Sequence, residues 1–238
     1  LDSARARFFY SNQIWKLPDL AVARANTRLE LSGEENDVTK NFNCHIHGAF
    51  EPELLRPLLP EHAARGLDHF TLTQPLHLDA DICGNGRDAD SLGVTGNLAL
   101  TNFAVRGQPV DSLFGKFSYT NRVLKFSDPR LSRAGGAQTM MADKIVLDFN
   151  TLRVYFTNGF SMADPLAVAR AIGPKTGELM EPYQFLQPPT VFVDGCAPMR
   201  DIQKPDDMTD ADLRFDIVGG APFRWRKVNL QQVKGLIH

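Results

Sequence analysis

The chain is poor in cysteine, nearly balanced in charge and free of long hydrophobic runs, and each of these excludes a class of protein. Its 238 residues include three cysteines, Cys44, Cys83 and Cys196, too few and too scattered for a disulfide framework or a zinc cluster. In an oxidising compartment, two of the three could form one disulfide bond. The formal net charge of −2 argues against nucleic acid as a partner, because nucleic-acid-binding proteins present a basic surface. No apolar run reaches the roughly 18 residues that a membrane-spanning helix needs.

Motifs of enzymes are also missing. The sequence has no G-x-S-x-G elbow, no phosphate-binding glycine loop and no H-E-x-x-H pair, which are the local signatures of common hydrolases, nucleotide-binding enzymes and zinc proteases. We therefore expect no enzymatic activity and no cofactor.

Two stretches resemble metal sites. His45 and His47 project from one face of a predicted strand, but a mononuclear site needs a third and usually a fourth ligand. The segment from Asp79 to Asp90 spaces its acidic residues like a calcium loop, yet Cys83 occupies a ligand position and no helices flank it. We expect a solvent-facing strand side at the histidines and a strand end plus a turn at the aspartates, with no bound metal.

What the chain does have is a composition that suits short strands and turns. It contains 18 Gly, 15 Pro and 16 Phe. The segment 115–131 predicts a β-hairpin with Asn121 and Arg122 as its two turn residues. Tyr119 then faces Leu124, and one step out Phe117 faces Phe126, all on one side of the hairpin. This alternation through a turn is what a half-buried hairpin requires.

The same hairpin pattern occurs earlier, in residues 8–20. Equivalent geometry places Tyr10 opposite Trp15 and Phe8 opposite Leu17. Other features recur at a similar spacing, since Pro52 and Pro165, like Pro75 and Pro188, lie 113 positions apart. A fixed period of this kind indicates an internal repeat. We predict two units, 1–110 and 111–238, which form one continuous domain.

Each predicted unit contains several strands and one brief helix. Helices are expected from Glu51-Pro52 and from Asp164-Pro165, the second ending at Gly173-Pro174. Residues 33–41 are expected to form a polar loop, residues 93–107 a hairpin or strand pair, and residues 224–237 strands. A strand is also expected over 142–149, in which Ile145, Leu147 and Phe149 alternate.

Three segments resemble the AsmA-like proteins of bacterial envelopes, namely YTNRVLKF (119–126), DPLAVARAIGP (164–174) and FLQPPTVFVDG (185–195). The closing segment 221–237 is similar to strands that lead into the next hairpin of that family. The resemblance implies a mainly β fold, a long curved antiparallel sheet or repeating β-groove, with two short helices. The related TamB-like and bridge-like lipid transfer proteins are thought to conduct lipids along such a groove.

The function expected from this resemblance is non-enzymatic binding or transfer of lipid. An antiparallel sheet with one apolar face must cover that face, either by closing into a sandwich or barrel or by holding acyl chains. The residues predicted to line the groove are Tyr10, Trp15, Leu17, Leu29, Leu31, Leu76, Leu78, Leu98, Leu100, Phe117, Tyr119, Leu124, Phe126, Ile145, Leu147, Phe149, Leu213 and Phe215. The same stripe also fits a closed protein core.

The expected partners are a phospholipid or another acyl lipid and inner- and outer-membrane proteins of the envelope, with no nucleic acid. The resemblance implies a periplasmic location and an anchor in the inner membrane through a segment outside this chain. Because the chain begins at Leu1 without an initiator Met, we expect it to be a piece of a longer protein. The alternatives are an adhesive or structural β-repeat scaffold that binds no lipid, and a β-rich enzyme acting on glycans.

Overall fold

One antiparallel sheet of 15 strands dominates the part of the chain that the structure describes. The computed structural model describes residues 2–25, 27–51, 67–199, 210–218, 222–231 and 234–237. The strands of the large sheet are β1 (Ser3–Ser11), β2 (Ile14–Arg24), β3 (Thr27–Asn36), β4 (Asn41–Phe50), β5 (Phe70–Leu72), β6 (Leu76–Asn85), β7 (Asp88–Val105), β8 (Gln108–Thr120), β9 (Val123–Arg133), β10 (Gln138–Met141), β11 (Lys144–Asp148), β12 (Arg153–Ser161), β14 (Thr190–Pro198), β15 (Asp212–Val218) and β18 (Gly235–Ile237).

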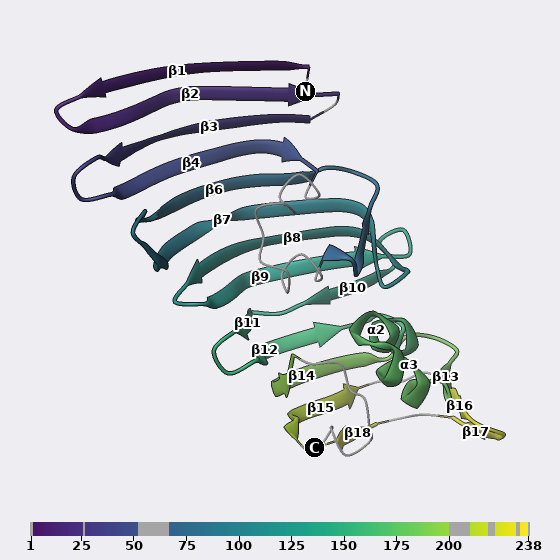
Figure 1. Cartoon of the computed structure of the whole chain (residues 1–238). Coiled ribbons are helices and arrows are strands. Elements are labelled where there is room, and N and C mark those ends of the chain that lie inside the picture. The colour runs from purple at the N-terminus through teal and green to yellow at the C-terminus, as the bar shows by residue number, and fades with distance from the viewer. Residues whose placement is uncertain are drawn as a thin grey trace.

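The strands follow one another almost in chain order, so the sheet grows from the N-terminus to the C-terminus (Figure 1). Strand β1 forms one edge and β18 the other, and the two chain ends lie at opposite ends of the curved sheet. Strands β10 and β11 share the space between β9 and β12. The mainly β fold with a long curved antiparallel sheet, predicted from the sequence, is confirmed.

The hairpin predicted at Asn121-Arg122 is present. Both turn residues have positive φ, 50° and 60°, as the two central residues of a type I′ turn require. Tyr119 pairs with Leu124 and Phe117 with Phe126, as the sequence pattern predicts.

The earlier copy of the hairpin, β1 and β2, has the same kind of turn. Asn12 and Gln13 have φ values of 52° and 63°, and Tyr10 pairs with Trp15. The predicted pairing of Phe8 with Leu17 is not found, because a β-bulge between Arg7 and Phe9 shifts the register at this point.

β-Bulges inside the strands keep apolar side chains on one face where strict alternation would reverse them. Phe126 and Leu131 in β9 are an odd number of residues apart, and a regular strand would place them on opposite faces. The register shifts between Ser127 and Arg130, next to Asp128 with its φ of 49°. The extra residue restores Leu131 to the face of Phe126. Bulges of this kind leave no simple trace in an alternation pattern.

Two short helices, α2 (Pro165–Ile172) and α3 (Pro174–Met180), follow β12. The Asp164 side chain accepts a hydrogen bond from the backbone N–H of Leu166 and so caps α2. Helix α2 begins and ends as predicted, with Asp164 as its N-cap and Gly173 as its C-cap, but a second helix that the sequence did not predict follows at once. Pro174 occupies the first turn of α3, where its missing N–H costs nothing. The helix predicted from Glu51-Pro52 lies outside the described residues, apart from Glu51 itself.

A second, smaller sheet of three strands contains β13 (Tyr183–Phe185), β16 (Phe223–Trp225) and β17 (Val228–Leu230). The strands expected over 224–237 are therefore divided between the two sheets, since only β18 joins the large one.

Other predictions also need correction. Strand β3 continues through Gly33 to Asn36, where a loop was expected, because Gly33–Glu35 pair with β4. Residues 93–105 belong to the single strand β7, and the turn follows it at Arg106-Gly107.

Few apolar side chains are fully buried. The buried hydrophobic residues in the described chain are Phe50, Ala80, Phe103, Val110, Ala142, Ala163, Ala167 and Ala169. Within the described ranges, the principal contacts of each strand are with its neighbours in the sheet, while α2 contacts α3, β8 and β13. The sheet is thus a single layer over most of its length.

The unit boundary predicted at 110/111 falls inside β8, and β7 and β8 pair along most of their lengths.

Candidate functional site

One face of the large sheet is apolar from its edge strand β1 to strand β15. A single row of cross-strand neighbours passes through twelve strands, β1 to β15, without a polar side chain. The row is Ala6, Leu20, Leu31, Ile46, Ala80, Gly96, Phe117, Phe126, Ile145, Phe156, Gly195 and Leu213. Direct cross-strand neighbours lie about 5 Å apart, so their side chains form one unbroken surface, here called the apolar face.

Two further rows widen the apolar face on either side. On one side run Leu17, Gly33, Cys44, Ile82, Val94, Tyr119, Leu124, Leu147, Val154 and Ala197. On the other side run Val22, Leu29, Gly48, Leu78, Leu98 and Gly115. Side chains two residues apart along a strand share a face, so these rows lie beside the first. The apolar face is therefore several residues wide.

The remaining predicted groove residues fall on or next to this surface, with one exception. Leu76 pairs with Phe50, Leu100 with Leu113, and Phe215 with Val193. Phe149 was predicted to extend the alternation of β11, but β11 ends at Asp148 and Phe149 lies in the following turn. Its backbone N–H donates to the carbonyl of Arg122, so it joins the turn after β11 to the turn between β8 and β9.

Several residues of the apolar face are missing from the sequence-based set, notably Leu20, Leu113, Leu131, Phe156 and Val193. Leu20 and Leu131 lie beyond bulges that hide their alternation. Val193 pairs with Gly159 and Phe215, which are distant in sequence, and Phe156 joins the distant Gly195 to the nearby Ile145. Only the cross-strand register identifies them.

Partial exposure distinguishes this surface from a closed core. All the aromatic and large aliphatic residues of the three rows are half-buried, none fully buried. At the β1 edge the face is open, since Tyr10 is 51% and Trp15 47% exposed, with ring centroids 4.6 Å apart. In the described part of the chain, helix α2 contacts β8, and no second sheet covers these strands.

The opposite face of the same strands is polar. One row on it contains Glu30, His47, Asp79, Asn97, Lys116, Ser127, Lys144 and Thr157. His47 Nδ1 lies 2.8 Å from an oxygen of Asp79, and His45 Nδ1 lies 2.9 Å from Asp81. These exposed pairs agree with the solvent-facing strand side expected at the histidines. Among the described residues, no three His, Cys, Asp or Glu side chains are placed to hold a metal ion.

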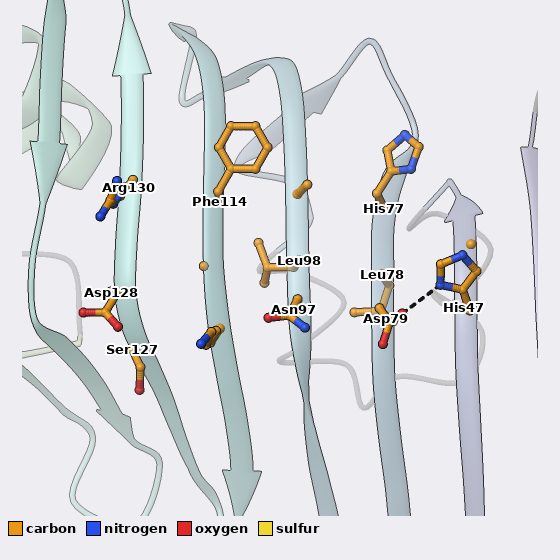
Figure 2. A pocket seen from close by; sticks show the side chains of 14 residues that line it. His47, His77, Leu78, Asp79, Asn97, Leu98, Phe114, Ser127, Asp128 and Arg130 are labelled. Atoms are coloured by element: carbon orange, nitrogen blue, oxygen red, sulfur yellow. Dashed lines mark hydrogen bonds and ion pairs between the residues drawn. The ribbon is translucent and has the colours of Figure 1, made fainter.

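A hollow of about 460 Å³ is lined by residues of β4, β6, β7, β8 and β9. Figure 2 shows the side chains that line it. Its lining includes His47, Asp79 and Lys116 of the polar row, with Phe114 and Arg130 from the neighbouring row on the same side. The hollow therefore belongs to the polar face. The face opposite the apolar face is thus mainly polar, with some exposed aromatic side chains such as Phe114, Tyr155 and Phe192.

The cysteines are distributed over both faces of the sheet. All three are free. Cys44 lies in a row of the apolar face, whereas the exposed Cys83 pairs with Asn43 and lies on the polar face. Burial raises the pKa of the Cys44 thiol, and the nearby Glu35 carboxylate adds to the rise. A raised pKa lowers the thiolate fraction, so Cys44 is intrinsically less reactive.

Comparison of the chain with protein-family models, with curated proteins and with solved structures finds no match. No helix in the described residues is long and apolar enough to cross a membrane.

Proposed function

We propose that the apolar face binds the acyl chains of lipids, and that the protein is a non-enzymatic lipid-binding or lipid-transfer segment. The observation that carries this proposal is the unbroken apolar row that crosses twelve strands while its aromatic and large aliphatic side chains stay partly exposed. Monomeric soluble proteins rarely expose contiguous apolar patches above a few hundred Å², and larger patches mark interaction sites.

Acyl chains suit this surface physically. Each CH₂ group that leaves water contributes about 0.8 kcal/mol, and aliphatic chains need no directional partner. A face that continues in the same form from strand to strand offers similar sites along its whole length, so a lipid moves along it by diffusion without chemistry. The polar head group remains in solvent at the strand ends.

The resemblance of residues 119–126, 164–174 and 185–195 to AsmA-like proteins adds support of a different kind. On this basis we propose a place in the bacterial envelope, in the periplasm, with lipid transport between membranes or maintenance of the outer membrane as the process served. Inner- and outer-membrane proteins are the corresponding partners. The alternative function is a scaffold that holds such partners without binding lipid, and the following experiment distinguishes the two functions.

Acyl lipid is expected to protect Cys44 from alkylation and to leave Cys83 unaffected. Without lipid, we expect Cys83 to react several-fold faster than Cys44 because Cys44 is half-buried and its thiol pKa is raised. With saturating phospholipid, the rate at Cys44 should fall by a further factor of about ten, since only the thiolate that reagent can reach reacts. Maleimide labelling followed by peptide mass spectrometry measures both rates in one sample. Equal rates at Cys44 with and without lipid would favour the scaffold.

A further inference from the structure

The apolar face ends in a polar row at one end of strands β8, β9 and β10. On β9, Leu131 and Arg133 share a face, and they pair with Met140 and Gln138 of β10. Leu113 of β8 pairs with Leu131, and Asp111 lies two residues before Leu113 on that same face. Beyond the last apolar row there is thus a group of three polar side chains, Asp111, Arg133 and Gln138.

Arg133 carries the one side-chain donor of this group, Nε, that is buried and unsatisfied within the described residues. Its neighbours are engaged elsewhere, since Gln138 Oε1 accepts from the backbone N–H of Asp164 at 3.1 Å and Asp111 Oδ2 accepts from that of Gly136 at 3.0 Å. A buried donor without an acceptor is destabilising, and more so if it is charged. Such a group is suited to an acceptor supplied by a ligand.

We propose that Arg133 binds the anionic head group, a phosphate or a carboxylate, of a lipid whose acyl chain lies on the apolar face. This inference rests on the proposed function and names the class of lipid. The guanidinium group is a planar donor that matches carboxylate and phosphate oxygens in a bidentate manner. Arg133 stands at a strand end, where a head group reaches solvent while its chain extends inward along β9.

The length of β9 fits this arrangement. At about 3.3 Å per residue, the distance along the sheet from Arg133 to Phe126 is roughly 20 Å, because the bulge adds a residue to β9 that the paired segment of β8 lacks. Half of a bilayer's hydrocarbon core is about 15 Å thick, so a lipid chain held at Arg133 extends past Leu131 toward Phe126, both of which are only partly buried. The head group and the chain are then both accommodated by one strand and its neighbours.

The test compares two fluorescent probes that differ only in charge, cis-parinaric acid and its methyl ester, at pH 8. Hydrogen bonds to charged groups contribute about 1.5–3 kcal/mol, so the intact protein should bind the acid roughly tenfold or more tightly than the ester. Arg133→Gln should remove this preference by weakening binding of the acid alone, and Arg133→Lys should keep part of it. Arg130→Gln is the matched control, because Arg130 is an exposed arginine of the same strand on the polar face.

The outcomes separate this inference from the proposed function. Equal binding of acid and ester by the intact protein, or an equal loss in Arg130→Gln and Arg133→Gln, would overturn the role of Arg133 while lipid binding stands. Binding of neither probe would overturn both. If Arg133→Gln does not fold, the role of Arg133 is still tested by the ratio of the affinities for acid and ester in the intact protein and in Arg133→Lys. Displacement of the acid by dioleoyl phosphatidic acid but not by dioleoylglycerol would show that the site binds a phosphate head group. If neither lipid displaces the acid, the site binds a free carboxylate. Equal displacement by both would contradict an anion site.

Discussion

Replacing Leu124 and Phe126 together by aspartate is expected to abolish acyl-lipid binding and leave the sheet folded. Both residues lie in central rows of the apolar face, where they pair with Leu147 and Ile145 of β11. An acyl chain placed over two carboxylates would strip them of water, which is strongly unfavourable. We expect lipid affinity to fall at least 100-fold, or by about 2.7 kcal/mol or more. Lipid extraction and titration with a fluorescent fatty acid measure the loss.

Stability should fall only modestly in this double variant. On an open face the aspartates stay hydrated, and the penalty is mainly the poor strand preference of Asp, about 1 kcal/mol per site. In a closed, dry core the same change would prevent folding. The matched control is Ser118→Asp with Ser127→Asp, which adds two charges to the polar face of β8 and β9 opposite Lys125, Lys116 and Lys144. Loss of lipid binding in this control, or unfolding of the Leu124→Asp/Phe126→Asp protein, would contradict an open apolar face.

Gly48→Ala is expected to destabilise the fold by about 3 kcal/mol. Gly48 lies in β4 with a φ of +141°, and a Cβ atom there would lie 2.1 Å from the backbone oxygen of Arg28 in the neighbouring strand. Both the backbone conformation and the close approach of β3 therefore require glycine at this position. Urea unfolding followed by circular dichroism measures the change.

Gly107→Ala is the control that separates strain from steric conflict. Gly107 also has positive φ, +76°, but it lies in an open turn, where a Cβ atom would have no other atom within 4 Å. Only the conformational penalty applies, about 1–2 kcal/mol. Losses of similar size in both variants would show that β3 and β4 do not approach each other as closely as described.

Local pattern and turn chemistry explain what the sequence predicted well. A reflected alternation around Asn121-Arg122 determines both the turn and the pairing of Phe117 with Phe126, since each depends on residues close in sequence. Most of the predicted groove residues lie on one face for the same reason. The start of α2 was also predictable, because Asp164-Pro165 combines an N-cap with a proline at the first helical turn.

Features set by contacts between distant strands were not predictable. The bulge at Asp128 places a non-glycine residue at positive φ and restores Leu131 to the apolar face, yet Asp and Arg next to a proline carry no distinct signal for it. Arg133 resembles any other strand charge until the register places it in line with Leu131. The division of the last strands between two sheets depends on β13, which pairs with β16 from about forty residues away.

Native mass spectrometry of the protein, purified without detergent and then exposed to phospholipid vesicles, tests the central claim most directly. Lipid binding to the open apolar face predicts adducts with the mass of one or more intact acyl lipids. These adducts should be absent from the Leu124→Asp/Phe126→Asp protein and retained by the Ser118→Asp/Ser127→Asp control. A single lipid-free mass for the intact protein, before and after exposure to vesicles, would contradict the proposal that the apolar face binds lipid.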